Sequence, residues 1–317
     1  MQICEVKIPG ILTTVQDSGR NGYQQYGVPV SGAMDEQSLI MANLLVGNND
    51  IEACLEITLA GPKLKFLIDT QIAITGADLS PTINDQEVDN WKTLMISKGD
   101  ILSFGQLRNG SRSYLSIQGG IDVPIILDSK STYVRGAFGG FYGRPLRTGD
   151  VIEGNRTTKL PTEPLTIPQG FVPHYENEIN VDVMIWPQSD HFTDKTRDRF
   201  LSNFYTITPH SDRMGYRLDG PRLTPKDSLK IISDAIPVGA IQVPTDGKPI
   251  ITMKDGQTTG GYPKIAVVST PDISRLGQTK PGDKIKFSKI SQSQAKLKLL
   301  NYWRILTELE KQLGKSK

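Results

Sequence analysis

Two arginines in glycine-rich segments are the strongest candidates for ligand binding in this sequence. Arg213 lies within residues 209–220 (PHSDRMGYRLDG), and Arg20 lies within the similar residues 16–27 (QDSGRNGYQQYG). A guanidinium group binds a carboxylate or a phosphate through two parallel hydrogen bonds. The alternative is that each arginine anchors its own loop to a carboxylate, such as Asp17 or Asp212. Both interpretations stay open, and ligand binding is favoured more at Arg213 than at Arg20.

A second set of candidates consists of carboxylates and amides near the ends of expected strands. Asp78 follows the apolar run 72–75, and Asp234 precedes the segment 236–244 (IPVGAIQVP). A carboxylate in such a position could act as a base or orient a water molecule, so Asp234, Asp78 and Arg213 are the candidate catalytic residues. The residues that could bind an amide substrate are Arg20, Tyr216, Gln242, Gln257 and Tyr262. Asp35 is explained as well by helix capping as by chemistry.

Several kinds of chemistry find no support in the sequence. No G-x-S-x-G nucleophile motif occurs, and nothing resembles a zinc site, so no metal is expected. The Gly-Lys-Ser at 314–316 lacks the upstream glycine of a phosphate-binding loop. A biotin-attachment Met-Lys-Met is also missing, because Met253-Lys254 is followed by Asp255. If biotin takes part, it is therefore carried by another chain.

Composition is typical of a globular protein with room for two cores. The chain has 317 residues, 37% hydrophobic and 22% charged, with a net charge of +2 from 36 basic and 34 acidic residues. Such a balance predicts no binding to nucleic acid or to a membrane. The two cysteines, Cys4 and Cys54, make no disulfide framework, and the first residues lack the apolar core of a signal peptide. These features lead us to expect a reduced, cytoplasmic protein.

Hydrophobic patterning and the 30 glycines and 20 prolines predict many short strands and few helices. The expected helices cover about 35–46, from 190 or 193 to about 203, and a C-terminal stretch behind the capping-box sequence 291–294 (SQSQ). The strand-like runs are 2–8, 11–16, 55–59, 64–68, 72–75, 94–97, 101–104, 113–118, 181–186, 229–232, 239–243, 249–253 and 264–268.

Two pairs of similar segments indicate that the chain is an internal duplication. Besides the two arginine segments, residues 98–104 (KGDILSF) match 281–287 (PGDKIKF), and both pairs occur in the same order. Four prolines mark a linker between the halves. We therefore predict an N-terminal domain over 1–155, a proline-rich linker over 156–176, a C-terminal domain over 177–290 and a C-terminal helix over 291–317.

These segments also carry a family resemblance. The chain closely resembles the KipA family, the C subunit of bacterial ATP-hydrolysing 5-oxoprolinase, and is similar to half of the carboxyltransferase domain of urea carboxylase, also called allophanate hydrolase subunit 2. The resemblance covers about residues 10–287. It rests on 13–17 (TTVQD), 27–35 (GVPVSGAMD), 55–58 (LEIT), 75–78 (TGAD) and the segment 209–268. The family implies a mainly β fold with a few helices, made of two tandem cyclophilin-like β-barrel domains.

The resemblance implies three functions, which the sequence does not separate. The first is a subunit of an ATP-dependent 5-oxoprolinase, which opens the lactam of 5-oxo-L-proline to L-glutamate together with a KipI-like B subunit and an A subunit. ATP would be a substrate of the whole complex. The second is a carboxyltransferase half that acts on carboxybiotin carried by another chain. The third is a non-catalytic antagonist that binds a KipI-like kinase inhibitor.

Overall fold

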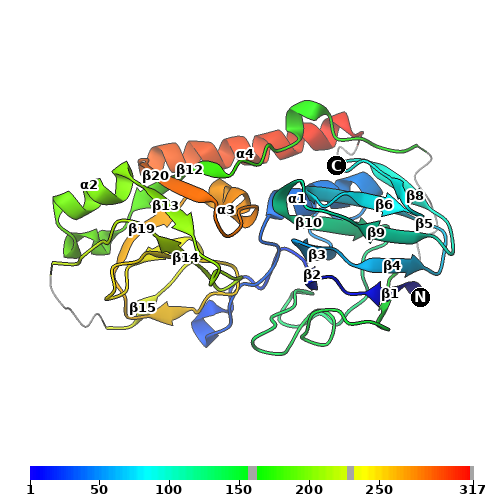
Figure 1. Cartoon of the computed structure of the whole chain (residues 1–317), viewed down its shortest axis with the longest axis horizontal. Coiled ribbons are helices and arrows are strands. Elements are labelled where there is room, and N and C mark those ends of the chain that lie inside the picture. The colour runs from blue at the N-terminus through cyan, green and yellow to red at the C-terminus, as the bar shows by residue number, and fades with distance from the viewer. Residues whose placement is uncertain (156–162, 227–231, 315–317) are drawn as a thin grey trace. The chain divides into compact units, whose positions relative to one another are not determined.

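The protein folds into two compact units, each of which is described by itself. The computed structural model describes residues 1–155, 163–226 and 232–314. The N-terminal unit comprises residues 1–21, 31–175 and the chain from 306 on, and the C-terminal unit comprises 22–30 and 176–305 (Figure 1). Residues 156–162 of the predicted linker and 229–231 of one predicted strand lie outside the described residues.

The N-terminal unit contains two antiparallel sheets. The six-stranded sheet has the order β11-β1-β4-β9-β6-β7, and its strands are β1 (Gln2–Ile8), β4 (Lys63–Phe66), β6 (Pro81–Ile83), β7 (Gln86–Glu87), β9 (Ile101–Phe104) and β11 (Val151–Glu153). The five-stranded sheet has the order β2-β3-β10-β5-β8, and its strands are β2 (Leu12–Gln16), β3 (Cys54–Thr58), β5 (Thr70–Asp78), β8 (Thr93–Ile96) and β10 (Asn109–Ile117).

The two sheets of the N-terminal unit share one apolar core. Phe66 and Leu102 from the larger sheet and Ile57 and Leu115 from the smaller one all belong to it and are fully buried. Along β3 and β10, alternate residues face this core, namely Leu55 and Ile57 in β3 and Leu115 and Ile117 in β10. Burial also raises the pKa of the thiols of Cys4 and Cys54 to about 12, so neither is a nucleophile at neutral pH.

The predicted first helix is confirmed as α1 (Glu36–Val46), which packs against β5 and β10. Asp35 caps it, because its side chain accepts a hydrogen bond from the Ser38 N–H at 3.1 Å. Gly47 ends it in the left-handed conformation with φ +79°. Residues 38–46 are all buried, so the helix is enclosed rather than lying on the surface.

The C-terminal unit contains a closed barrel of seven strands and a separate two-stranded sheet (Figure 1). In barrel order the strands are β12 (Glu178–Ile185), β19 (Lys264–Val268), β16 (Ala240–Gln242), β17 (Ile250–Thr252), β14 (Gly215–Asp219), β13 (Phe204–Ile207) and β20 (Lys284–Lys289). Only β12 and β20 pair in parallel among these neighbours. The small antiparallel sheet consists of β15 (Asp234–Ala235) and β18 (Thr259–Gly260), which are not consecutive in the chain, and we call it the β15–β18 sheet.

Three helices follow strands of this part of the chain, and two of them were predicted. Thr193 caps α2 (Asp194–Ser202), and Ser291 and Gln294 form the expected capping box of α4 (Gln292–Gln312). The sequence analysis did not predict α3 (Thr270–Gly277), although a proline in its first turn is a start signal. Three short 3-10 helices cover Gln24–Tyr26, Gln169–Phe171 and Pro187–His191.

The predicted duplication is visible in one turn that occurs in both units. Gly99 and Gly282 adopt φ +100° and +96°, and each is followed by an aspartate just before a strand. Asp100 accepts a hydrogen bond from the N–H three residues before it at 2.8 Å, and Asp283 does the same at 2.9 Å. The same chemistry therefore starts β9 and β20.

The two halves nevertheless differ in closure. The mainly β fold is confirmed, and the C-terminal unit has the expected closed barrel, whereas the N-terminal strands form two sheets. The arginine segments differ as well. Arg213 leads into strand β14, but the residues after Arg20 contain only the 3-10 helix Gln24–Tyr26. Similar sequence thus gave different local structure in the two copies.

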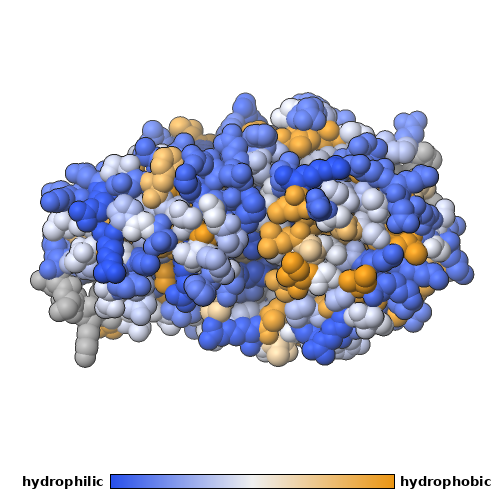
Figure 2. All heavy atoms as spheres, in the orientation of Figure 1, coloured by the Kyte–Doolittle hydropathy of each residue, from blue (hydrophilic) through white to orange (hydrophobic). Residues whose placement is uncertain are grey.

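The surface is mostly hydrophilic with local apolar areas. Figure 2 shows that on the face in view hydrophobic side chains gather over the N-terminal unit. The exposed apolar residues of that unit include Ile11 at 69% and Ile125 at 68%. Among the described residues, no helix has the length and apolar character needed to cross a bilayer.

Candidate functional site

The carboxylate of Asp234 is held by several hydrogen-bond donors at the β15–β18 sheet of the C-terminal unit. Asp234 lies opposite Gly260 in the pairing of β15 with β18. Its Oδ2 accepts hydrogen bonds from Lys264 Nζ and Gln188 Nε2, both at 3.0 Å. Its Oδ1 accepts one from the Ala235 N–H at 2.8 Å. These donors, Lys264 above all, lower the pKa of Asp234 below the ordinary 3.8. Asp234 is therefore an anion at neutral pH.

Lys264 is the buried cation behind this carboxylate. Its side chain is 0% exposed, whereas that of Asp234 is 50% exposed. A buried ammonium group needs a partner, and Asp234 supplies it while the Trp186 ring lies 5.9 Å from Nζ. A ligand can thus reach Asp234 but not Lys264, which makes Lys264 a positioning residue. Lys264 was not among the site residues predicted from the sequence, where its signal was a charged residue at the start of an apolar strand.

Glutamine side chains lie around the same β15–β18 sheet. A Cβ atom on Gly260 would lie 2.8 Å from Gln257 Nε2 and 3.5 Å from Gln242 Oε1, so both predicted amides approach this glycine. Gln242 is buried and donates to Thr252 Oγ1 at 3.1 Å, whereas Gln257 is exposed. The structure therefore brings Asp234, Gln242 and Gln257 together around Gly260. No pattern in the sequence had indicated that these three residues are neighbours.

The two predicted tyrosines lie in different surroundings. Tyr262 is 45% exposed and lies between Gly260 and Lys264 in sequence, so its ring is accessible to a ligand. Tyr216 is 2% exposed and pairs with Ile251 inside the barrel wall. A ligand would have to displace the barrel to reach Tyr216, so we interpret this residue as part of the core.

Arg213 anchors a loop through a buried ion pair. Its Nε donates to Asp255 Oδ2 at 2.9 Å and its Nη2 donates to Asp255 Oδ1 at 3.1 Å. The two side chains are 6% and 7% exposed. The carboxylate is Asp255 instead of the suggested Asp212, which accepts from the Met214 N–H at 2.8 Å. This arrangement supports the loop-anchor interpretation of Arg213.

Arg20 has the same kind of role in the N-terminal unit. It is fully buried, its Nε donates to the Ile126 carbonyl at 3.1 Å, and its Nη2 donates to the Ser131 carbonyl. Its guanidinium carbon lies 4.9 Å from the centroid of the Phe138 ring. The suggested partner Asp17 accepts instead from Ser129 Oγ at 2.7 Å. Arg20 therefore holds a loop in place, and its burial argues against contact with a ligand.

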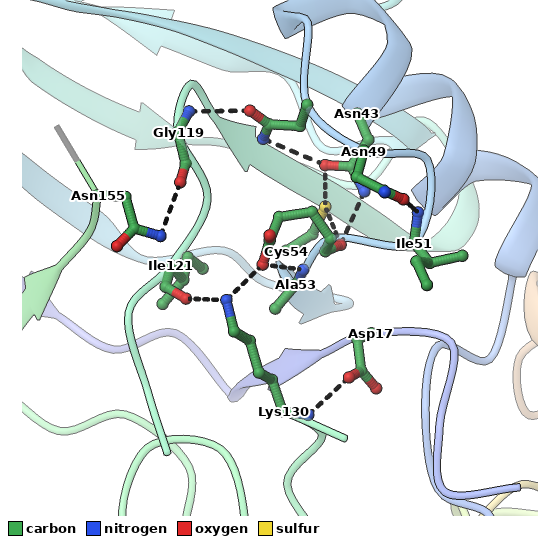
Figure 3. A network of polar contacts seen from close by, with 12 residues as sticks. Asp17, Asn43, Asn49, Ile51, Ala53, Cys54, Gly119, Ile121, Lys130 and Asn155 are labelled. Atoms are coloured by element: carbon green, nitrogen blue, oxygen red, sulfur yellow. Dashed lines mark hydrogen bonds and ion pairs between the residues drawn. The ribbon is translucent and has the colours of Figure 1, made fainter. Parts of the chain in front are cut away.

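Further polar contacts fix the loops of the N-terminal unit (Figure 3). Lys130 Nζ donates to Glu52 Oε1 at 2.6 Å and to the Ile121 carbonyl at 3.0 Å, while the Lys130 N–H donates to Asp17 Oδ2. Asn155 Nδ2 reaches the Gly119 carbonyl at 3.2 Å. Each contact ties a loop to a strand or to another loop, so this network is structural.

A buried carboxylate network lies at the start of α1. Tyr114, fully buried, donates from its hydroxyl to Glu56 Oε2 at 2.8 Å and accepts from the Asp35 N–H at 2.8 Å. Glu56 also accepts from the Met34 N–H at 2.8 Å. Burial first, and the nearby charge of Glu56 next, raise the pKa of Tyr114 well above 10. Asp35 is thus explained by capping and by this network.

Asp78 lies in the N-terminal unit and Asp234 in the C-terminal one, so the two predicted catalytic carboxylates belong to separate units. Asp78 ends β5, accepts a hydrogen bond from the Ser80 N–H at 2.8 Å and lines a pocket. Arg108, which the sequence analysis did not single out, lines the same pocket.

Comparisons with known proteins place these features in a family. The family model "Carboxyltransferase domain, subdomain A and B" matches residues 26–289. The chain is 37% identical to the C subunit of 5-oxoprolinase from Haemophilus influenzae, over 91% of this chain and 92% of that protein. It is also 37% identical to urea amidolyase of Lachancea kluyveri, over 92% of this chain but only 17% of that protein.

A solved structure agrees over nearly the whole chain. The crystal structure of the K. lactis urea amidolyase superimposes with a TM-score of 0.92 at 36% sequence identity, covering 97% of this chain and 20% of that one. This chain thus spans less than a quarter of the urea amidolyases that it matches and nearly all of the 5-oxoprolinase relative.

Proposed function

Since the chain belongs to the family of the carboxyltransferase domain, subdomains A and B, we propose that it is a subunit of an ATP-dependent 5-oxoprolinase complex. The observation that carries the proposal is the 37% identity to the C subunit of the Haemophilus influenzae 5-oxoprolinase over 92% of that protein's length. The complex would open the lactam of 5-oxo-L-proline to L-glutamate in the cytoplasm.

The side chains at the β15–β18 sheet of the C-terminal unit are suited to binding a cyclic amide. The anionic, half-exposed carboxylate of Asp234 can accept a hydrogen bond from the lactam N–H. The exposed amide of Gln257 and the hydroxyl of Tyr262 can bond the carbonyl or carboxylate of the substrate. Because the pKa of Asp234 is lowered, its role is binding and orientation, and it is a weak base for proton abstraction.

The proposed reaction needs partners that supply the remaining groups. A lactam is a poor electrophile, and transfer of the γ-phosphoryl group of ATP to its oxygen, with release of ADP, activates the ring carbon. Water would then add to that carbon, the C–N bond would break with the ring nitrogen leaving as the amine, and a second water would hydrolyse the resulting acyl phosphate to L-glutamate and phosphate. We propose that a KipI-like B subunit and a separate A subunit supply the rest of this chemistry, with the site shared with the B subunit. The apolar side chains exposed on the N-terminal unit give such a partner a surface to bind (Figure 2).

Coupled ADP release from the reconstituted complex tests the proposal. We expect release that depends on 5-oxo-L-proline, none from this chain alone, and a single peak with the B subunit in size-exclusion chromatography. Asp234→Asn should reduce turnover at least about tenfold, since it removes one charge-assisted contact. Asp219→Asn is the matched control. Asp219 also pairs with a lysine, Lys248, at 2.9 Å, but the side chains of both residues are exposed. A verified complex without ADP release would overturn the proposal.

A second function follows from the structural match. The TM-score of 0.92 to the K. lactis urea amidolyase favours a carboxyltransferase half that acts on carboxybiotin carried by another chain. The amide-binding groups at Gly260 would suit a ureido ring as well as a lactam. Urea-dependent loss of the carboxyl group from a carboxylated biotin carrier, with no response to 5-oxo-L-proline, would select this function instead.

A further inference from the structure

The N-terminal unit contains a pocket of about 210 Å³ to which the proposed reaction assigns no role. Its lining comes from the end of β5, the segment 87–91, the start of β10 and residues 172–175. We call it the Asp78 pocket, after the carboxylate at the end of β5. All of these residues belong to the N-terminal unit, so the pocket is a property of that unit.

An irregularity in the pairing of β5 with β10 creates the pocket. Asp78 pairs with Asn109, but Gly76 pairs with Ser113, so two steps along β5 correspond to four along β10. A bulge of this kind interrupts the ladder and redirects side chains, and bulges are common beside functional sites. The Asp78 N–H donates to the Asn109 side chain at 3.2 Å. The bulge thus exposes Asp78 to the pocket.

The charges at the pocket leave one negative charge uncompensated. Asp78, Glu87 and Asp89 line it, against the cation Arg108 in the lining and Lys92 beside it. Arg108 is hydrogen-bonded to Glu87, whose pKa it lowers, and Lys92 pairs with Asp89 at 2.7 Å. The nearest cation to the Asp78 carboxylate is Arg108 Nη1 at 3.6 Å. Three carboxylates minus two cations leave an excess of one, and Asp78 is the least compensated of the three.

The aromatic residues Tyr175 and Trp91 line the pocket. The Tyr175 hydroxyl is 3.1 Å from Ser38 Oγ and donates to Asp35 Oδ2 at 3.4 Å, which holds its ring in place. The backbone N–H of Trp91 donates to the Ile74 carbonyl at 2.7 Å. Trp91 adopts a φ of +65°, a conformation that is rare for a bulky residue. Aromatic rings beside a negative charge favour a cationic ligand, because the ring faces are electron-rich.

A buried hydrogen-bond acceptor in the lining also favours a ligand that donates hydrogen bonds. Asn90 lines the pocket, and its Nδ2 donates to the Ala77 carbonyl at 3.3 Å. Its buried Oδ1 meets no hydrogen-bond donor among the described residues. An unsatisfied buried acceptor is destabilising, so a ligand that donates hydrogen bonds is favoured over one that accepts them.

We propose that the Asp78 pocket binds a small ligand with one primary ammonium group on a short aliphatic chain. The ammonium group would neutralise Asp78 and donate to the acceptors of the lining, while the aliphatic part would contact the rings and the apolar residues Val88, Val172 and Pro173. The ligand can be a free amine or the side chain of a lysine on a partner. Neither source of the ammonium group involves ATP or 5-oxo-L-proline, so this proposal is independent of the proposed 5-oxoprolinase activity.

Titration calorimetry on the full chain tests the proposal with n-butylammonium chloride as the probe and 1-butanol as its uncharged counterpart. We expect the ammonium ion to bind at least about tenfold tighter than the alcohol. Asp78→Asn should remove at least about tenfold of the affinity, because it removes the uncompensated charge and keeps the acceptor for the Ser80 N–H. Asp85→Asn is the control, since Asp85 is exposed between β6 and β7 and does not line the pocket.

Several results would overturn the proposal. Equal affinity for the ammonium ion and the alcohol, or no saturable binding of either, would exclude an ammonium site even if Asp78→Asn failed to fold. A folded Asp78→Asn protein, verified by its melting temperature, that kept wild-type affinity would exclude Asp78 as the binding group. If n-butylammonium binds, a lysine-containing peptide that binds at least about tenfold tighter would identify a partner side chain as the source, and one that binds no tighter would identify a free amine.

Discussion

Lys264 and Asp234 form an ion pair of 3.0 Å in which the cation is completely buried and the carboxylate is half-exposed. The asymmetry separates two roles that one pair usually shares. Asp234 is accessible to a ligand at the β15–β18 sheet. Lys264 is buried beside it and fixes the charge and orientation of its carboxylate.

Lys264→Met should reduce turnover of the complex while raising the pKa of Asp234 towards the ordinary 3.8, because the largest cause of its lowering is lost. Carbon-13 NMR of the Asp234 carboxyl group during a pH titration measures the shift. Lys248→Met is the control, because Lys248 is 45% exposed and pairs with Asp219. An unchanged Asp234 titration in a folded Lys264→Met protein would contradict the assigned role.

Arg213→Ala should lower the free energy of unfolding by about 3–5 kcal/mol, because it leaves Asp255 buried without its cation. Urea denaturation measures the loss. Arg217→Ala, at an exposed position four residues away, should cost far less. If Arg213→Ala abolished activity at unchanged stability, Arg213 would be a ligand-binding residue after all.

Tyr114→Phe should cost about 1–3 kcal/mol of stability, because both Glu56 and the Asp35 N–H lose a hydrogen-bond partner in a buried site. Thermal and urea unfolding should agree on the change. Tyr142→Phe, at a side chain that is 80% exposed, serves as the control and should leave stability unchanged. Equal stability of the two variants would mean that the network at α1 contributes nothing.

Lys298→Met should weaken the attachment of α4 to α3. Lys298 Nζ donates to Asp272 Oδ2 at 2.6 Å, and Asp272 also binds Arg275. We expect a loss of about 1.5–3 kcal/mol, the usual contribution of a hydrogen bond to a charged group. Lys296→Met is the control, because Lys296 is exposed on the same helix. Proteolysis within α4 should accelerate only in the first variant.

The same contact predicts a pH dependence. Burial alone would raise the pKa of Asp272, but hydrogen bonds from Lys298 and Arg275 outweigh it and lower the pKa below 3.8. A lowered folded pKa stabilises the protein fully above the unfolded value, and the contribution disappears as the pH falls through the folded value. Stability should therefore fall with pH below about 4 in the wild type, and less so in Lys298→Met. Parallel curves for the two proteins would contradict this.

The sequence by itself determined the features that depend on neighbouring residues. Asp35 and Gly47 bound α1, and Ser291 starts α4, because a cap acts on backbone groups within one turn of its own position. The turns at Gly99 and Gly282 were visible as a repeat, because glycine accepts a positive φ without strain. The mainly β fold followed from the same local patterns.

Only the tertiary structure decided what the charged residues do. Arg213 meets Asp255 across 42 residues, and Lys264 meets Asp234 across 30. The sequence shows the same residue types whether a charge is solvated, paired or directed at a ligand, and the choice depends on which strands enclose it. Arg20 and Arg213 therefore became loop anchors, while Lys264 acquired a role that its position in an apolar strand only hinted at, because burial makes an unpaired charge too costly to keep.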